Sequence, residues 1–242
     1  MRIRILILSA LWVLVSAYAS AQVKWVGAGD GSSWNDAANW SSNAVPVATD
    51  NILLDNTSVL TNYDVNLPAG AVTVTINSIT ITPAAANTIR LILPVTNTAI
   101  DGLNITEAGD ALVLNTGGYF INASAANVNI DGNLVVNSGS SLDASSGANS
   151  PVLSIKGNIL INAGATGSIT ESGTGNPVIK LNGNSSQTIT SVTGAITGDN
   201  LDFAVNTTGT VSLLSSVFLP HSLFVQAGTI DIQIQRSVIH WD

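Results

Sequence analysis

The sequence predicts an all-β fold, a right-handed parallel β-helix (β-solenoid) with an N-terminal aromatic cap. Short segments alternate apolar and hydroxyl residues at a period of two, as in Val72–Ile76, which is typical of strands with one buried face. Similar strand-and-turn units recur along the chain, and Glu, which favours helices, occurs only at Glu107 and Glu171. An antiparallel β-sandwich is the alternative fold, because short strands between Gly and Asn turns suit it too.

The first 21 residues have the order of a secretory signal peptide. Arg2 and Arg4 precede an apolar run, and Ala19-Ser20-Ala21 supplies the small residues of a cleavage site. The apolar run is shorter than the roughly 20 residues that span a bilayer. We therefore expect a secreted or cell-surface protein from which residues 1–21 are removed. After this cleavage we expect no transmembrane segment.

Residues 22–70 are predicted to form a capping segment. The end of a solenoid exposes unpaired strand edges and a cross-section of apolar core, and Trp25, Trp34 and Trp40 are bulky enough to cover it. The same three indoles could instead stack on sugar rings. The run Asp30–Asp36 is rich in oxygen ligands and raises the question of calcium, but it lacks the spacing of known calcium loops.

Residues 71–242 are predicted to be solenoid repeats, truncated at the C-terminus. The segment Leu112–Gly117 recurs as Leu134–Gly139 and Ile159–Gly164, with a looser fourth copy at Leu223–Gly228. Turn glycines recur at similar intervals alongside these copies, and we expect them to stack in successive coils. They are Gly102, Gly132, Gly157 and Gly183. A period in the low twenties suits one coil of two or three strands, so about eight or nine coils would fit.

In each of the three closest copies an asparagine closes the strand, at Asn115, Asn137 and Asn162. Amides at the same place in successive coils can hydrogen-bond to one another as a structural ladder. Asn also tolerates left-handed backbone geometry, so the turn alone could explain it.

Two parts of the chain resemble a known family. The segment from Val23 to Asp55, VKWVGAGDGSSWNDAANWSSNAVPVATDNILLD, resembles the opening of large, repetitive secreted β-solenoid proteins found among type IX secretion cargo and autotransporter-like adhesins. Residues from Lys180 to Ile232 look like the repeat of that family. The resemblance implies a secreted structural or adhesive protein, usually far longer, with a C-terminal sorting module that this sequence does not contain.

Composition excludes several classes of function. The net charge is −8 with no basic cluster, so phosphate would repel the chain and nucleic acid is not an expected partner. There is no Cys, hence no disulfide or thiolate metal site. His221 and His240 lack a recognisable nucleophile, and Asp199 and Asp202 lack the nearby basic residues of polysaccharide-cleaving β-helices. We therefore expect no enzyme activity, no cofactor and no metal.

The expected function is that of a non-catalytic, structural or adhesive surface solenoid. Its partners would be extracellular glycans or neighbouring cell surfaces, reached by weak contacts that add up through avidity. A carbohydrate-binding or polysaccharide-processing module is the alternative. If the chain ends at Asp242, the last coil carries no evident aromatic cap beyond Trp241, and we then also predict end-to-end self-association that depends on concentration.

Overall fold

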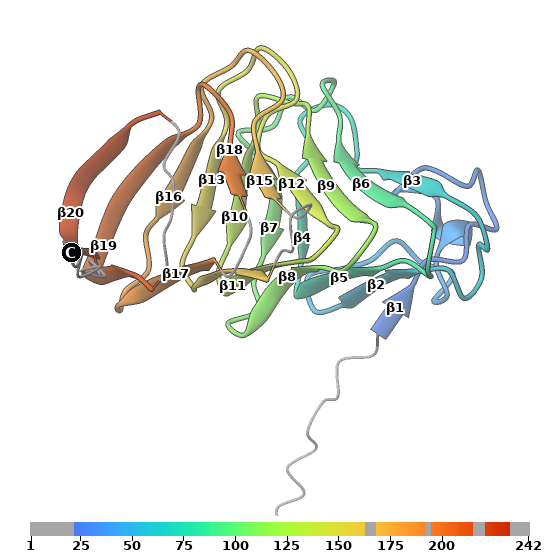
Figure 1. The fold of residues 1–242 in the computed structure, drawn as a ribbon. Helices are drawn as coiled ribbons and strands as arrows, with labels where there is room; N and C mark the ends of the chain where they lie inside the picture. The colour runs from blue at the N-terminus through green and yellow to red at the C-terminus, as the bar shows by residue number, and fades with distance from the viewer. Residues whose placement is uncertain (1–21, 163–167, 192–194, 215–220, 233–242) are drawn as a thin grey trace, which may run out of the picture.

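The chain forms a parallel β-solenoid of about seven turns (Figure 1). This computed structural model describes residues 22–162, 168–191, 195–214 and 221–232. All pairs of named strands in these ranges are parallel. The predicted fold class is therefore confirmed, and the antiparallel sandwich is excluded.

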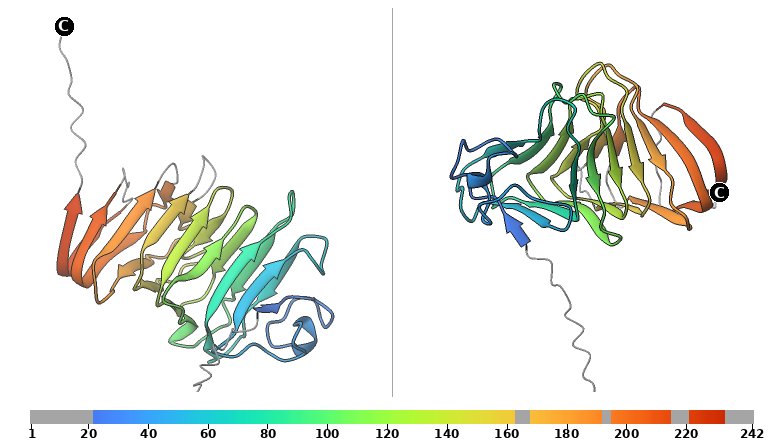
Figure 2. Two further views of the ribbon diagram at one scale, coloured as in Figure 1. Left: turned by 90° about the horizontal axis from the view of Figure 1, so that it is seen from below. Right: turned by 180° about the vertical axis from the view of Figure 1, so that it is seen from behind.

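Each full turn contains three strands, which lie on three faces of the stack (Figure 2). The ladder face consists of β1 (Gln22–Lys24), β2 (Asn51–Asp55), β5 (Ser78–Thr82), β8 (Asp110–Leu114), β11 (Asn133–Asn137), β14 (Ile159–Asn162) and β17 (Gln187–Ser191). The third face consists of β3 (Tyr63–Asn66), β6 (Ile89–Leu93), β9 (Gly118–Asn122), β12 (Ser141–Asp143), β15 (Ser168–Thr170) and β18 (Ala195–Thr197). The groove face consists of β4 (Val74–Ile76), β7 (Asp101–Ile105), β10 (Asn127–Ile130), β13 (Val152–Ile155) and β16 (Val178–Leu181).

The last two strands are longer than the others and join two faces. β19 (Asp202–Leu213) pairs with β16 of the groove face and then with β17 of the ladder face, and β20 (Leu223–Ile232) follows β19 on both. These two faces are consequently one 14-stranded sheet, while the third face is a separate sheet of six strands.

Inward side chains form rows that run along the axis of the stack. On the ladder face, Ile79, Leu112, Leu134 and Ile159 occupy equivalent positions in successive coils and are fully buried. Neighbouring strands lie about 4.8 Å apart, so each side chain packs directly on the next. Burial of each contributes roughly 1.5–3 kcal/mol, and only the stacked coils together make a continuous core.

The structure confirms the register predicted from the three closest repeats. Leu112 pairs with Leu134 and Leu134 with Ile159. The prediction that Leu223–Gly228 is a fourth copy of the same strand was wrong, because Leu223 pairs with Phe203 on the groove face. Coils are also longer elsewhere, as Ile79 pairs with Leu112 and Ile159 with Ile189, which explains why the chain makes fewer turns than expected.

Stacked glycines form the corner between the groove face and the ladder face. A Cβ atom on Gly132 would lie 2.2 Å from the carbonyl oxygen of Gly109, and one on Gly157 would lie 2.3 Å from the carbonyl carbon of Gly132. A side chain at this corner would therefore collide with the preceding coil. Gly102 was predicted for this row but lies within β7, and Gly109 takes its place.

The N-terminal segment covers the first coil and carries an aromatic cluster. β1 pairs with β2, Ser33 bridges to Asn66 of β3, and a short 3₁₀ turn, η1, spans Ala37–Asn39. The stack begins before the predicted boundary at residue 70, because β2 and β3 already pair with β5 and β6. The predicted signal peptide, residues 1–21, lies outside the described residues.

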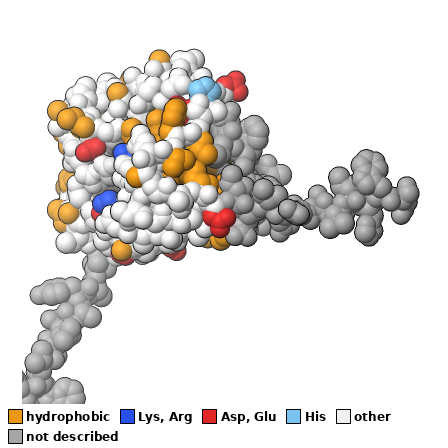
Figure 3. All heavy atoms as spheres, turned by 90° about the vertical axis from the view of Figure 1, so that its left-hand side faces the viewer, with side chains coloured by type: hydrophobic (Ala, Val, Ile, Leu, Met, Phe, Trp, Pro, Cys, Tyr) orange, Lys and Arg blue, Asp and Glu red, His pale blue; other side chains and the backbone are white. Residues whose placement is uncertain are grey.

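The opposite end of the stack exposes apolar side chains (Figure 3). In β20, Leu223, Phe224 and Val225 are 40%, 49% and 54% exposed. Within the described ranges, β20 pairs with β19 only. A search of the same residues for a helix long and apolar enough to cross a membrane finds none.

Candidate functional site: a polar groove

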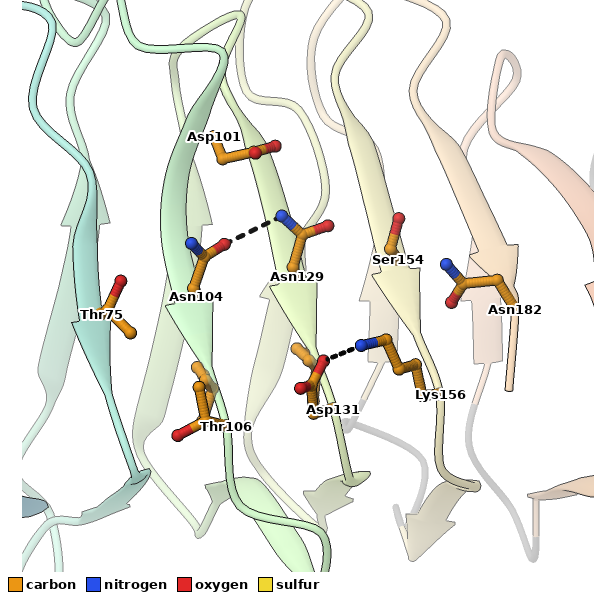
Figure 4. Close-up of a pocket in the computed structure, with 11 residues that line it drawn as sticks. Thr75, Asp101, Asn104, Thr106, Asn129, Asp131, Ser154, Lys156 and Asn182 are labelled. Carbon is orange, nitrogen blue, oxygen red and sulfur yellow. Dashed lines mark hydrogen bonds and ion pairs between the residues drawn. The ribbon is translucent and has the colours of Figure 1, made fainter. Parts of the chain in front are cut away.

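A shallow groove of about 290 Å³ crosses several coils of the groove face (Figure 4). Its centre is a row of outward side chains with one member per coil. Strand register aligns Thr75, Asn104, Asn129, Ser154 and Lys180, of which the first four line the groove. Each lies between two inward apolar residues, because side chains alternate along a strand. The fold therefore repeats a polar group at each coil.

A second row lies where the same strands end, just before the glycine corner. Thr106, Asp131, Lys156 and Asn182 follow one another in successive coils, as shown by the backbone hydrogen bonds from Asp131, Lys156 and Asn182 to the preceding coil. Lys156 Nζ lies 2.7 Å from Asp131 Oδ1. No described residue donates to the buried Oδ1 of Asn182.

Hydrogen bonds between coils hold the groove side chains in place. Asn129 Nδ2 donates to Asn104 Oδ1 at 2.9 Å, and Asn127 Nδ2 donates to Asp101 Oδ1 at 3.3 Å. Among the described residues nothing accepts from Asn104 Nδ2 or donates to Asn129 Oδ1. One donor and one acceptor of this amide pair thus remain for a ligand.

The ladder face differs in its outward row. Its equivalent positions are Leu53, Thr80, Val113, Val135, Leu160 and Thr190. Aliphatic side chains dominate this row and offer few hydrogen-bonding groups. Polar rows also occur on the other two faces: Asp64, Arg90, Tyr119, Ser141 and Ser168 on the third face, and Asn115, Asn137 and Asn162 at the ends of the ladder strands.

The three predicted tryptophans are packed inside the N-terminal segment. Trp25, Trp34 and Trp40 are 0%, 1% and 0% exposed. The ring centroids of Trp25 and Trp40 lie 4.9 Å apart and those of Trp34 and Trp40 lie 4.7 Å apart, all in edge-on geometry. Trp25 also stacks on Tyr63 of the first coil. A buried ring has no face for a sugar, so this arrangement fits a cap and not a glycan platform.

The loop Asp30–Asp36 uses its carboxylate oxygens internally. Asp30 Oδ1 accepts from the backbone of Ser32 and Ser33 and from Asn39 Nδ2, at 2.9, 2.8 and 2.8 Å. These bonds lower the pKa of Asp30, the Ser32 N–H having the largest effect. Asp36 accepts from the backbone of Asp30 and Ala38. Three of the four carboxylate oxygens of Asp30 and Asp36 therefore already receive N–H donors.

Asn39 fixes that loop from its centre. It is fully buried, accepts from the backbone N–H of Gly29 and Gly31, and donates to Asp30 Oδ1 and to the carbonyl of Ser33. All four bonds that an amide side chain can make are formed. This asparagine accordingly has a structural role. Over the described residues, no group of three or more His, Asp or Glu is placed to hold a metal ion.

The three repeat asparagines line up along the stack. Asn137 Nδ2 donates to Asn115 Oδ1 at 2.7 Å, and Asn162 Nδ2 donates to Asn137 Oδ1 at 3.0 Å. Asn137 is half-buried, whereas Asn162 is exposed. The effect of these bonds on stability is a prediction, which is developed in the Discussion.

The two predicted carboxylates, Asp199 and Asp202, have separate partners. Asp202 Oδ1 lies 2.6 Å from His221 Nδ1, and Ser222 Oγ lies 3.3 Å from the same nitrogen. A serine–histidine–carboxylate relay needs its serine and carboxylate on opposite ring nitrogens. This cluster does not have that geometry, and His240 lies outside the described residues.

Asp199 instead contributes to an acidic corner near the third face. Burial raises the pKa of Glu171, and the neighbouring charges of Asp143 and Asp199 raise it further. A backbone hydrogen bond from Asn200 acts in the opposite direction. The buried Oε1 of Glu171 has no hydrogen-bond partner among the described residues. The corner therefore disfavours the charged form of Glu171.

No family model, curated protein or solved structure matches the chain. The class of protein is therefore defined by the fold and the groove: a parallel β-solenoid with a polar groove on one face.

Sequence reasoning missed the groove, although a signal for it was present. Leu103-Asn104-Ile105, Val128-Asn129-Ile130, Leu153-Ser154-Ile155 and Ile179-Lys180-Leu181 each place one polar residue between two aliphatic ones. The four triplets are 25, 25 and 26 residues apart, in step with the coils. A search for the polar member of each repeat would have found the row.

Proposed function

We propose that this protein is a secreted, cell-surface structural or adhesive solenoid without catalytic activity, and that the groove is its contact surface. The polar row on the groove face is the observation that supports the proposal most. Stacked coils hold its side chains at a regular spacing, so a partner binds with little loss of side-chain freedom. The signal-like composition of residues 1–21 supports secretion, and the resemblance to type IX cargo and autotransporter-like adhesins supports a surface location.

Carbohydrate binding is compatible with the same groove, whereas polysaccharide cleavage has less support. Glycoside hydrolysis needs two carboxyl groups that face one another across the scissile bond. In the groove, Asp131 is paired with Lys156 and Asp101 with Asn127. Both carboxylates of the groove lining thus already have partners.

An adhesion assay tests the proposal. Beads coated with the purified protein are flowed over cells and over films of extracellular polysaccharide, and the retained beads are counted. The Asn104→Ala/Asn129→Ala variant should lose most retention, since many weak contacts act together. The matched control is Asn133→Ala, which removes a similar amide contact, from Asn133 to Asp110, on the ladder face. Equal retention of all three proteins, or no retention at all, would overturn the proposal.

A further inference from the structure

We infer that the groove binds a neutral, hydroxyl-rich polysaccharide that lies along the solenoid axis with about one sugar per coil. This inference rests on the proposed function and names the ligand of the same site. It is carried by three features of the groove: the type of its hydrogen-bonding groups, its charge and its spacing.

The hydrogen-bonding groups suit hydroxyls. Sugar hydroxyls both donate and accept, and so do the amides and hydroxyls of the groove. The amide pair presents Asn104 Nδ2 as a donor and Asn129 Oδ1 as an acceptor. Thr75 and Ser154 extend the row on either side with hydroxyl groups (Figure 4). A strand of hydroxyls can therefore form bonds with every coil it crosses.

The charge of the groove favours an uncharged ligand. Lys156 and Asp131 largely neutralise each other at 2.7 Å. Asp101 of the lining and Lys180, which continues the central row, carry opposite charges, so the groove has no excess positive charge to attract an anion. The whole chain carries a net charge of −8, and a polyanion such as a uronate or sulfated polysaccharide would meet repulsion at long range.

The structure of the groove favours an extended glycan chain over a peptide. From β7 to β16 each strand of the groove face is hydrogen-bonded to a neighbour on both sides, so a peptide cannot join the sheet there as an added β-strand; β4 alone lies at the edge of this sheet. No aromatic side chain lines the groove, and its lining offers no deep apolar pocket. The residues that line it come from five coils, β4 to β16, which span about 19 Å at the usual strand spacing. Successive sugars of an extended glycan follow one another at a similar spacing.

Titration with oligosaccharides of increasing length tests the inference. The probes are (1→4)-β-linked oligosaccharides of glucose, xylose or mannose, from two to six units long. Polygalacturonate and alginate serve as acidic comparators, and the affinity of each probe is measured by isothermal titration calorimetry. Affinity should rise with each added sugar and level off at about four or five units. Asn129→Ala should weaken binding roughly two- to tenfold, the value of one hydrogen bond, while Asn133→Ala leaves it unchanged.

Each outcome bears on one of the two proposals. Binding of an acidic polymer in preference to all neutral ones, or affinity independent of length, would overturn the ligand assignment. If no oligosaccharide binds but beads still adhere through the groove, the adhesive function stands and the glycan inference fails. Equal melting temperatures of the two asparagine variants would exclude a folding defect as the cause of lost binding.

Discussion

At the scale of single residues, polar side chains form hydrogen bonds that connect successive coils. Amides that bond to the preceding coil are found at the ladder and in the groove, whereas the Asn39 amide bonds within the loop of the cap. The sequence alone predicted the ladder because its three asparagines close nearly identical segments. It did not predict Asn39 or Glu171, because their roles depend on loops folding back on distant residues. Sequence spacing shows which residues repeat but not which loops meet.

The Asn ladder predicts a graded loss of stability. Asn137 bonds to both neighbouring asparagines and Asn115 to one of them. Asn137→Val should therefore destabilise the fold by about 1–3 kcal/mol and Asn115→Val by about half as much, at about 1 kcal/mol per hydrogen bond. Thermal unfolding followed by circular dichroism measures both. An unchanged melting temperature in Asn137→Val would remove the ladder from the forces that stabilise the stack.

Glu171 predicts a pH-dependent gain of stability on neutralisation. The pKa of Glu171 is raised in the folded state, so its favourable contribution is present below the unfolded pKa and is lost as the pH rises through the folded pKa. Glu171→Gln should raise the melting temperature at pH 8, and the difference should vanish below about pH 4, where the carboxyl is protonated in both states. A variant less stable than the wild type at pH 8 would show that the carboxylate is favourably bound.

At the scale of elements, the coils vary in length while the strands keep their register. Coils that keep the same loop lengths gave correct predictions, as in the row from Leu112 to Ile159. The prediction of the glycine row failed where one coil is longer than the others. Ile79 and Leu112 are paired there although they are 33 residues apart. Gly102 was assigned to a corner that Gly109 occupies. Loop length, which no repeat constrains, is what the sequence left open.

The N-terminal cap makes a prediction of its own. Trp34 is buried against Trp40, and its backbone pairs with Asn66 of the first coil. Trp34→Ala should destabilise the protein by about 3–5 kcal/mol, as expected for a large buried aromatic side chain. Urea unfolding followed by tryptophan fluorescence measures the loss, and Trp34→Phe should recover part of it. Full stability combined with lost glycan binding would support the sugar-platform hypothesis instead.

The exposed strand at the other end predicts self-association of the purified chain. β20 carries Leu223, Phe224 and Val225 at its surface and pairs, within the described residues, with β19 alone. Such an edge can pair with a second chain. Light scattering should show mass rising with concentration, and Phe224→Lys should shift the equilibrium towards the monomer. A monomer at all concentrations would contradict this prediction.

At the scale of the whole molecule, the stack converts a one-dimensional repeat into a two-dimensional surface. Three faces with different outward rows arise from one strand pattern, because each face stacks the equivalent side chains of successive coils on one another. The fold class followed from the sequence, since periodicity and composition agreed. The polar groove did not follow, because the repeat is evident from its apolar residues and turns and not from the polar residues between them.

The chain's three lysines provide the most direct test of the groove as the contact surface. Lys156 lines the groove and Lys180 continues its central row, whereas Lys24 pairs with Asp55 on β1 and β2, away from it. Acetylation of each lysine, read by mass spectrometry, is compared in solution and on the surface that retains the protein. We predict that Lys156 and Lys180 become protected while Lys24 reacts at an unchanged rate. Protection of Lys24 alone, or equal reactivity of all three lysines in both states, would contradict the assignment of the groove.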